Sequence, residues 1–365
     1  MIFIVGSSRQ RICYPTYIIQ NFELLKFPWL LLEISELFLF IITLFYSIKC
    51  SYIVLKVRTF HMNLSVLTVV LIVQFSEILV AKVCSWPYET GFWRLRGLSN
   101  ASLTNTTLKQ WLTDDESEMI EVIDLSTDFP FFFSGYLKLH YAISVSNIFL
   151  VIAVERSFAC YFLNDYEKKS RFWIAVAIVL VDQMFNLVVA YLFFLFYFSF
   201  FYMILITAAP NLVAITLLLY SRHYNLKITR IHEDYAHQSN YTLAARFQAK
   251  ENVKCFNMIR MVLISLIGIL IFGFTTCFAL YFNIFPQADS LLNLCMQAVI
   301  NLSALVMCPA ILYSVDSFRN HTFLCKKLKK KRENTSITPH VSTVKNLELM
   351  KETEIHFNQL TNTWI

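Results

Sequence analysis

The feature that most constrains this chain is a series of long apolar stretches. A helix that crosses a bilayer needs about 20 mostly apolar residues, and its lipid-exposed backbone must satisfy its own hydrogen bonds. Seven stretches meet this requirement, so the expected fold is all-α, a seven-transmembrane helix bundle. The predicted spans are 29–52, 62–84, 130–154, 172–193, 199–221, 259–282 and 290–315. The chain is apolar almost without a break from Phe172 to Tyr220, which predicts a tight turn near Phe196–Ser199.

The composition excludes a soluble globular domain. Hydrophobic residues make up 57% of the chain and charged residues only 15%, against about 25% charged in an average soluble protein. A soluble domain of this kind would expose apolar patches far larger than the few hundred Å² that monomers tolerate. The sequence also has no phosphate-binding loop, no zinc-protease motif and no nucleophile elbow, so we predict neither an enzyme nor a cofactor.

The distribution of positive charge predicts the topology, because Lys and Arg are enriched in cytoplasmic loops. Basic residues are frequent in the odd-numbered connections and after the last span, and the fourth and sixth connections have none. They are Lys49, Lys56 and Arg58 in the first connection, Arg156, Lys168, Lys169 and Arg171 in the third, Lys227, Arg230, Arg246, Lys250 and Lys254 in the fifth (223–258), and the run 326–332. We therefore expect an extracellular N-terminal segment (1–28) and a cytoplasmic tail (316–365).

The second connection, residues 85–129, is acidic and is expected outside the cell. It carries two glycosylation acceptors of the Asn-x-Ser/Thr type, Asn100 and Asn105, well away from the flanking spans. Because such triplets also occur by chance, they support this placement only together with the charge pattern.

Several charged side chains fall in the outer halves of the first three spans, where charge is costly unless it is paired or hydrated. They are Glu33, Glu36, Glu77, Lys82 and Lys138. One hypothesis is a water-filled outer pocket for a ligand, with Glu36, Glu77 and Lys138 as candidate lining residues. The alternative for Lys82 and Lys138 is that their long side chains reach up to the membrane surface.

Two features mark the inner end of the predicted bundle. Glu155 and Arg156 close the third span, either as a switch whose partners change when helices move or as an ordinary charge pair at the membrane exit. Pro309 removes one backbone hydrogen bond from the seventh span and favours a kink. That kink is either a hinge or a packing feature, and Tyr313 follows it one turn later.

A basic stripe leads into the sixth span, because Arg246, Lys250 and Lys254 recur at every fourth residue. It would meet membrane lipid headgroups or an acidic cytoplasmic partner. Aromatic residues are not interleaved with it, so we predict no nucleic-acid binding. Cys325, beside the cluster of lysines, is either a palmitoylation site or a free thiol.

Three blocks of the sequence resemble the nematode serpentine chemoreceptors of class epsilon (Sre), which are seven-transmembrane G-protein-coupled receptors. The first is Glu155–Ala159 followed by Asn164–Arg171, the second is Leu243–Val253 before the sixth span, and the third is Phe60–Leu64 at the second span. Together they anchor the resemblance across residues 30 to 320.

The resemblance implies a chemosensory receptor in the plasma membrane of sensory neurons. It implies a small-molecule extracellular ligand and a heterotrimeric G protein as the inner partner. The chain departs from the large rhodopsin-like family, since Glu155-Arg156-Ser157 stands in place of Asp-Arg-Tyr. Cys308-Pro309 with Tyr313 also has one residue more than Asn-Pro-x-x-Tyr. Details of rhodopsin-like activation therefore do not transfer to this chain.

Two other classes of membrane protein remain as alternatives. A transporter or channel subunit would use intramembrane charges to line a substrate path, but the inverted repeats and broken helices common in transporters are not evident in the sequence. A membrane enzyme would need clusters of His and carboxylates at the inner ends of the helices, and these are missing from the sequence.

Overall fold

The computed structural model describes residues 1–322 with several gaps. The gaps are residues 7, 58–59, 101–102, 104–105, 111–114, 163–171, 199, 235–242 and 283. Residues Met1–Phe318 form one compact unit, to which the description below applies, and the chain from Arg319 onward is a separate unit.

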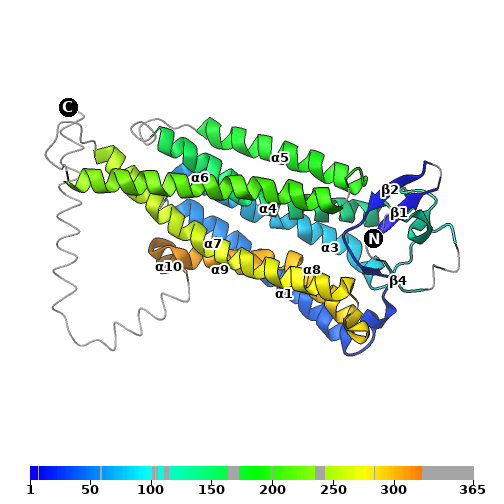
Figure 1. Cartoon of the computed structure of the whole chain (residues 1–365). Coiled ribbons are helices and arrows are strands. Elements are labelled where there is room, and N and C mark those ends of the chain that lie inside the picture. The colour runs from blue at the N-terminus through cyan, green and yellow to red at the C-terminus, as the bar shows by residue number, and fades with distance from the viewer. Residues whose placement is uncertain are drawn as a thin grey trace, which may run out of the picture. The chain divides into compact units, whose positions relative to one another are not determined.

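The unit is a bundle of long helices that lie side by side (Figure 1). They are α1 (Trp29–Val57), α2 (Met62–Val73), α3 (Phe75–Glu89), α4 (Phe129–Tyr161), α5 (Phe172–Phe194), α6 (Phe200–Asp234), α7 (Leu243–Tyr281), α8 (Asp289–Asn301) and α9 (Ser303–Ser314), followed by α10 (Asp316–His321). In the described residues, six spans are long and apolar enough to cross a membrane, and there are seven if the bent pair α8–α9 counts as one. This confirms the prediction of a mostly helical, multi-pass membrane protein.

Helix α4 is the central element, because it packs against α3, α5 and α6. The share of buried residues in its apolar window is 67%, against 22% for α5. The low values elsewhere are expected of helices that turn a broad apolar face to lipid rather than to protein. The side chains that α4 buries therefore lie where several helices can reach them.

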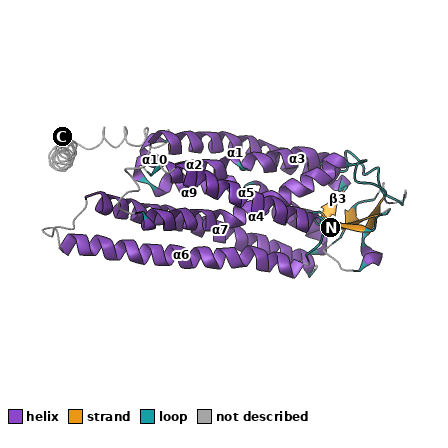
Figure 2. Cartoon of the chain, turned by 90° about the horizontal axis from the view of Figure 1, so that it is seen from above, coloured by secondary structure: helices purple, strands orange, loops and turns teal. Residues whose placement is uncertain are grey.

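The structure corrects the expectation of an all-α fold, since two small sheets cover one end of the bundle (Figure 2). In the first, β1 (Ile2–Val5) pairs antiparallel with β2 (Gln10–Cys13) and parallel with β5 (Ile120–Val122). In the second, β3 (Ile18–Ile19) pairs antiparallel with β4 (Leu108–Lys109). These strands form the cap, and the end of the bundle that they cover is the cap end.

Aromatic packing fixes the cap on the start of α4. Phe3 contacts Phe131 and Phe132 edge to face, and Tyr14 stacks on Phe131 with ring centroids 4.0 Å apart. The Tyr14 hydroxyl also lies 3.0 Å from Ser134 Oγ. Aromatic pairs of this kind contribute about 0.5–1.5 kcal/mol each beyond the area they bury. The cap is therefore a packed part of the bundle.

Two boundaries differ from the sequence-based expectation. The inner connection expected over 223–258 is much shorter, because α6 continues to Asp234 and α7 begins at Leu243. The expected outer loop 85–129 also begins later, since α3 continues to Glu89. Apolar content marks where a helix lies in the membrane, and it does not mark where the helical backbone ends.

The bend in the last span also differs from expectation. Pro309, where the sequence favoured a kink, lies inside α9. The break in the last span lies at Leu302, between α8 and α9, which meet at 41°. At the break, Ser303 Oγ donates to the Ile300 carbonyl (3.0 Å), and the Tyr141 hydroxyl of α4 lies 2.8 Å from the same Oγ. Side-chain bonds to a neighbouring helix, rather than proline, thus mark the bend.

Candidate functional site

Five charged side chains gather in the bundle just beneath the cap. They are Glu33 and Glu36 of α1, Lys82 and Glu89 of α3, and Lys138 of α4, and each is at most 5% exposed. We call this group the cap-end charge cluster. A buried charge is costly unless it is paired and hydrogen-bonded, so the arrangement of these groups determines whether the end of the bundle holds together.

Lys82 is the hub of the cap-end charge cluster. Its Nζ lies 3.1 Å from Glu36 Oε2, 3.3 Å from Glu89 Oε2 and 3.8 Å from Glu33 Oε2. Lys138 pairs with the other oxygen of Glu89. The alternative that Lys82 and Lys138 extend to the membrane surface does not hold, because both ammonium groups point into this cluster.

Two neutral N–H groups also donate hydrogen bonds to the carboxylates of the cluster. Trp86 Nε1 donates to Glu33 (3.0 Å), and Asn301 Nδ2 of α8 donates to Glu36 (2.9 Å). Glu36 Oε2 lies 3.1 Å from the Lys82 ammonium and has no further donor among the described residues. The cluster thus links α1, α3, α4 and α8.

Residues that follow β2 lie over the cluster and close it from the cap side. Gln297 Nε2 of α8 donates to Thr16 Oγ1 (2.8 Å), and the Lys138 ammonium lies 5.5 Å from the centre of the Tyr14 ring. Burial, and then the nearby Glu89 carboxylate, raise the pKa of Tyr14 well above its ordinary value. Tyr14 is therefore a neutral hydroxyl that presents its ring face to the ammonium group.

The free space at the cluster is small. A cavity of about 10 Å³ is lined by Ile18, Leu24, Glu33, Glu36, Lys82, Glu89, Asn293, Leu294 and Gln297. That is about the space that one water needs, whereas drug-sized ligand sites measure about 300–1,000 Å³. The structure therefore holds charged groups where an outer pocket was predicted, but in a closed form.

The predicted lining residues separate into two places. Glu36 and Lys138 belong to the cap-end charge cluster, whereas Glu77 lies 2.7 Å from His140 Nδ1 and takes no part in it. Glu89 is a member that the sequence analysis missed. It lies beyond the span expected to end at residue 84 and was therefore counted with the acidic outer loop.

A second polar network lies at the opposite end of α4, where Glu155 and Arg156 are fully buried. Arg156 donates through Nε to Glu155 Oε2 (2.5 Å) and through Nη2 to Glu155 Oε1 (2.7 Å). This two-bond geometry is the strongest that arginine and a carboxylate make. The alternative of an ordinary charge pair at the membrane exit does not describe groups with no solvent exposure.

Two asparagines extend this pair to neighbouring helices. Arg156 Nη1 donates to Asn252 Oδ1 of α7 (2.9 Å), and Asn252 Nδ2 donates to Asn225 Oδ1 of α6 (3.0 Å). Asn225 Nδ2 in turn donates to the Ser221 carbonyl (2.7 Å). We call Glu155, Arg156, Asn225 and Asn252 the Arg156 network. It ties α4, α6 and α7 together in the part of the bundle farthest from the cap.

The sequence analysis missed both asparagines. Asn252 lies in the block Leu243–Val253 that carries the resemblance, but it was assigned to a loop, and Asn225 was assigned to the same loop. The sequence feature that could have identified them is an amide side chain near the end of an apolar helix, where it can bind a buried arginine of another helix. Only the observed extents of α6 and α7 reveal that feature.

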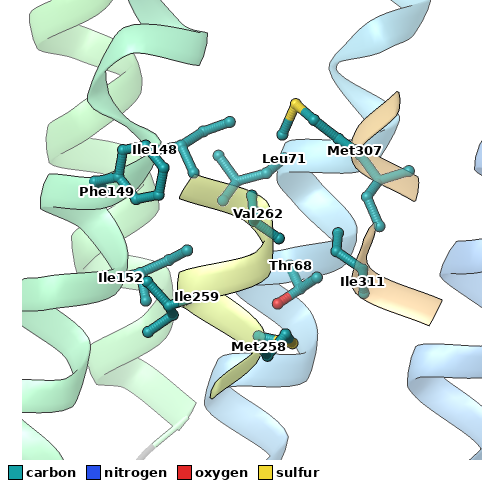
Figure 3. Close-up of a pocket in the computed structure, with 11 residues that line it drawn as sticks. Thr68, Leu71, Ile148, Phe149, Ile152, Met258, Ile259, Val262, Met307 and Ile311 are labelled. Atoms are coloured by element: carbon teal, nitrogen blue, oxygen red, sulfur yellow. The ribbon is translucent and has the colours of Figure 1, made fainter. Parts of the chain in front are cut away.

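An apolar cavity of about 30 Å³ separates α2, α4, α7 and α9 midway along the bundle (Figure 3). Ile148 and Ile152 of α4 face Val262 of α7 and Ile311 of α9 across it. Thr68 brings the one hydroxyl of the lining, which donates to the Leu64 carbonyl (2.8 Å). Atoms that line a gap lose dispersion contacts, so packing between these helices is incomplete.

The remaining sequence-predicted residues have diverse placements. Tyr313 of α9 is 43% exposed, and Asn100 is exposed in the connection that leads to the cap. Arg246, Lys250 and Lys254 belong to α7, but their side chains lie outside the described part of the chain, as do Asn105 and Cys325. Cys13 and Cys84 are both free thiols.

Comparisons with known proteins give one consistent result. The family model described as Sre G protein-coupled chemoreceptor matches residues 1–365. Serpentine receptor class epsilon-45 of Caenorhabditis elegans is 39% identical over the full length of both chains. Serpentine receptor class epsilon-38 of the same organism is 26% identical, with 98% of this chain and 99% of that one covered. No solved structure matches this chain.

Proposed function

Because this chain belongs to the Sre family of G protein-coupled chemoreceptors, we propose that it binds an extracellular chemical cue at the cap end and signals to a heterotrimeric G protein at the Arg156 end. The full-length match to the family carries this proposal. The two buried polar groups at opposite ends of α4 support it, since a receptor needs two separate sites with a coupling free energy between them.

The proposed orientation has the N-terminus and the cap outside the cell. Its support is the excess of Lys and Arg in the connections at the Arg156 end and in the tail. In this orientation the chain is a multi-pass plasma-membrane protein of sensory neurons, with Asn100 and Asn105 glycosylated outside and Cys325 palmitoylated inside. An epitope tag after Arg332 should stain only after cells are permeabilised. Staining of intact cells would invert the orientation and remove the proposal.

The proposed resting state is the one in which the Arg156 network is closed. A ligand shifts the equilibrium only by its difference in affinity for the two states, so the ligand must favour a state in which α6 and α7 have moved away from Arg156. The apolar gap between α4, α7 and α9 lowers the packing energy that resists this movement. The break at Leu302 is the proposed hinge, in place of Pro309, and Tyr313 would move with α9.

The inner partner would meet the surface that opens beside Arg156. Arg246, Lys250 and Lys254 recur along α7 toward this end, and they would contact the G protein or the anionic headgroups of the inner leaflet. At the other end, Glu36 and Lys138 would contact the ligand after the cap has shifted, because the closed cavity has room for about one water.

The direct test is calcium imaging in cells that express the chain, challenged with a broad odorant and pheromone panel. Once a ligand is found, Arg156→Ala should abolish the response when it is compared with wild type at equal surface expression. Normal ligand-evoked signalling in this variant would contradict the assignment of Arg156. A ligand-gated current in a purified bilayer without G protein would instead favour a transporter or channel subunit.

A further inference from the structure

The cap-end charge cluster is not balanced. Three carboxylates, Glu33, Glu36 and Glu89, face two ammonium groups, Lys82 and Lys138, and all five side chains are buried. No other Lys, Arg or His of the described residues makes an ion pair with these carboxylates. One formal negative charge is thus enclosed in a site where an uncompensated charge is strongly unfavourable.

The position of the surplus charge follows from the distances. Glu89 has two cation partners, because both Lys82 and Lys138 contact it. Glu33 and Glu36 share only Lys82, which is 3.8 Å from Glu33 and 3.1 Å from Glu36. The two residues lie on one face of α1 at a spacing of three, where their side chains are neighbours. The positive charge that is lacking therefore belongs between Glu33 and Glu36.

A second, independent observation indicates a ligand at the same place. Glu36 Oε2 is buried, and its partner among the described residues is the Lys82 ammonium 3.1 Å away, which leaves one of its two lone pairs for a second donor. Glu33 and Glu36 both line the cavity of about 10 Å³, whose other walls include the apolar side chains Ile18, Leu24 and Leu294. Space for one water-sized group, next to a carboxylate oxygen with remaining acceptor capacity and an apolar wall, matches the ammonium head of a ligand.

We propose that the cap-end charge cluster recognises an organic ligand through a primary ammonium group, which binds between Glu33 and Glu36. An ammonium group carries three N–H donors, and it would give Glu36 Oε2 a second donor beside Lys82 while it neutralises the surplus charge. Once the cap has shifted as proposed above, the alkyl part of the ligand would lie against Ile18, Leu24 and Leu294. This rests on the proposed function, because it names the class of cue that such a receptor takes.

The test uses the purified full-length chain in lipid nanodiscs and measures its thermal unfolding. The probes are n-butylammonium and n-hexylammonium, compared with the neutral alcohols and the carboxylates of the same chain lengths. The ammonium probes should raise the unfolding temperature with saturable concentration dependence, whereas the alcohols and the carboxylates should not. Equal shifts for ammonium and alcohol probes, or no shift for the ammonium probes, would overturn the proposal.

Matched variants locate the effect. Glu33→Gln keeps the shape of the side chain and removes the surplus charge. It should therefore raise the ammonium concentration that gives the half-maximal shift in unfolding temperature about tenfold or more. Asp182→Asn alters a carboxylate of α5 that bonds within its own helix (Asn186 Nδ2, 3.0 Å), and it should keep the wild-type response. An ammonium shift that survives Glu33→Gln unchanged would also overturn the proposal, since the binding would then be elsewhere.

Two further comparisons distinguish a metal cation from an ammonium ligand and separate this inference from the proposed receptor role. If sodium chloride raised the unfolding temperature while choline chloride and the ammonium probes did not, the site would bind a metal cation and the ammonium proposal would be overturned. Binding of ammonium probes without any cellular response would support this inference and count against the receptor role. A cellular response to an uncharged cue, with no ammonium binding, would support the receptor role and overturn this inference.

Discussion

The two ends of α4 handle buried charge in different ways. At the cap end, five ionic groups from three helices make a cluster with one surplus carboxylate and a small cavity. At the other end, one arginine and one carboxylate balance each other, Arg156 also donates to the neutral amide of Asn252, and Asn252 donates to Asn225. An added cation would neutralise the surplus charge of the first arrangement, whereas the formal charges of Glu155 and Arg156 already balance in the second.

This difference fits two separate roles for the two ends of α4. An unbalanced cluster changes its energy when a charged ligand arrives, so it suits detection. A balanced network changes only when helices are pulled apart, so it suits a latch between conformations. Because α4 carries Lys138 near one end and Arg156 near the other, a shift of this helix would be felt in both places.

The largest effect should follow from removing the hub of the cap-end charge cluster. Lys82→Met leaves three buried carboxylates with one ammonium partner, and loss of one member of a buried ion pair costs about 3–5 kcal/mol. We expect a large drop in the unfolding temperature of the purified chain and little protein at the cell surface.

The double variant Lys82→Met/Glu33→Gln provides the control. It lowers the negative charge of the cluster by one unit relative to Lys82→Met, so it should recover part of the lost stability. An unfolding temperature of Lys82→Met equal to that of wild type would show that the cluster does not hold the cap end together, and the contrast between the two ends would fail.

The next largest effect concerns the Arg156 network. Asn252→Ala leaves the Glu155–Arg156 pair intact and removes the bond to α7, and hydrogen bonds to charged groups contribute about 1.5–3 kcal/mol. If this bond holds the resting state, basal G protein signalling should rise in cells without ligand, at wild-type surface expression.

Ser265→Ala serves as the matched control on the same helix, because Ser265 Oγ donates to the carbonyl of Met261 in its own helix (3.0 Å). It should leave basal signalling unchanged. Wild-type basal signalling in Asn252→Ala, with the protein at the surface, would show that the network is structural and not a latch.

The sequence predicted features that depend on neighbouring residues better than features that depend on residues far apart in the chain. Hydropathy reports what surrounds a segment, so it located the membrane helices and drew attention to charges inside them. The strands of the cap are two to four residues long. Strand β1 pairs with β5, more than 100 residues away in sequence. Pairing over such a distance leaves no local pattern.

The sites show the same limit. Glu33, Glu36, Lys82 and Lys138 were recognisable because charge is rare in apolar helices. Which of them meet was not, and Glu77 was grouped with them although it contacts His140. The break at Leu302 was also missed, and it lies beside the Asn301–Glu36 and Tyr141–Ser303 bonds between helices. The sequence did not show which side chains of different helices are in contact.

A moderate effect should follow from a change midway between the two ends. Tyr141→Phe keeps the buried ring and removes the hydroxyl that meets Ser303 Oγ at the bend (2.8 Å). A neutral hydrogen bond contributes about 0.5–1.5 kcal/mol, so the unfolding temperature should fall by less than for Lys82→Met. Tyr136→Phe, whose hydroxyl makes a longer bond at 3.4 Å, should change it less. An equal or greater drop in Tyr136→Phe would remove the special role of the bend.

The smallest effect belongs to the exposed ion pair of the cap, and it sharpens the contrast with the buried cluster. Arg11 Nη2 lies 2.7 Å from Glu116 Oε1 at the surface, and exposed pairs contribute little because water and salt screen them. The hydrogen bond from Arg11, and then its charge, lower the pKa of Glu116. A carboxyl whose pKa is lower in the folded state stabilises the protein above its unfolded pKa of about 4.3. That contribution is lost as the pH falls through the lowered pKa.

Glu116→Gln should therefore leave the unfolding temperature at pH 7 nearly unchanged and slightly flatten its fall below about pH 4.3. Glu118→Gln, two residues along the same exposed turn, is the control. A drop at pH 7 as large as that of Lys82→Met would mean that burial does not separate the strong ion pairs of this receptor from the weak ones.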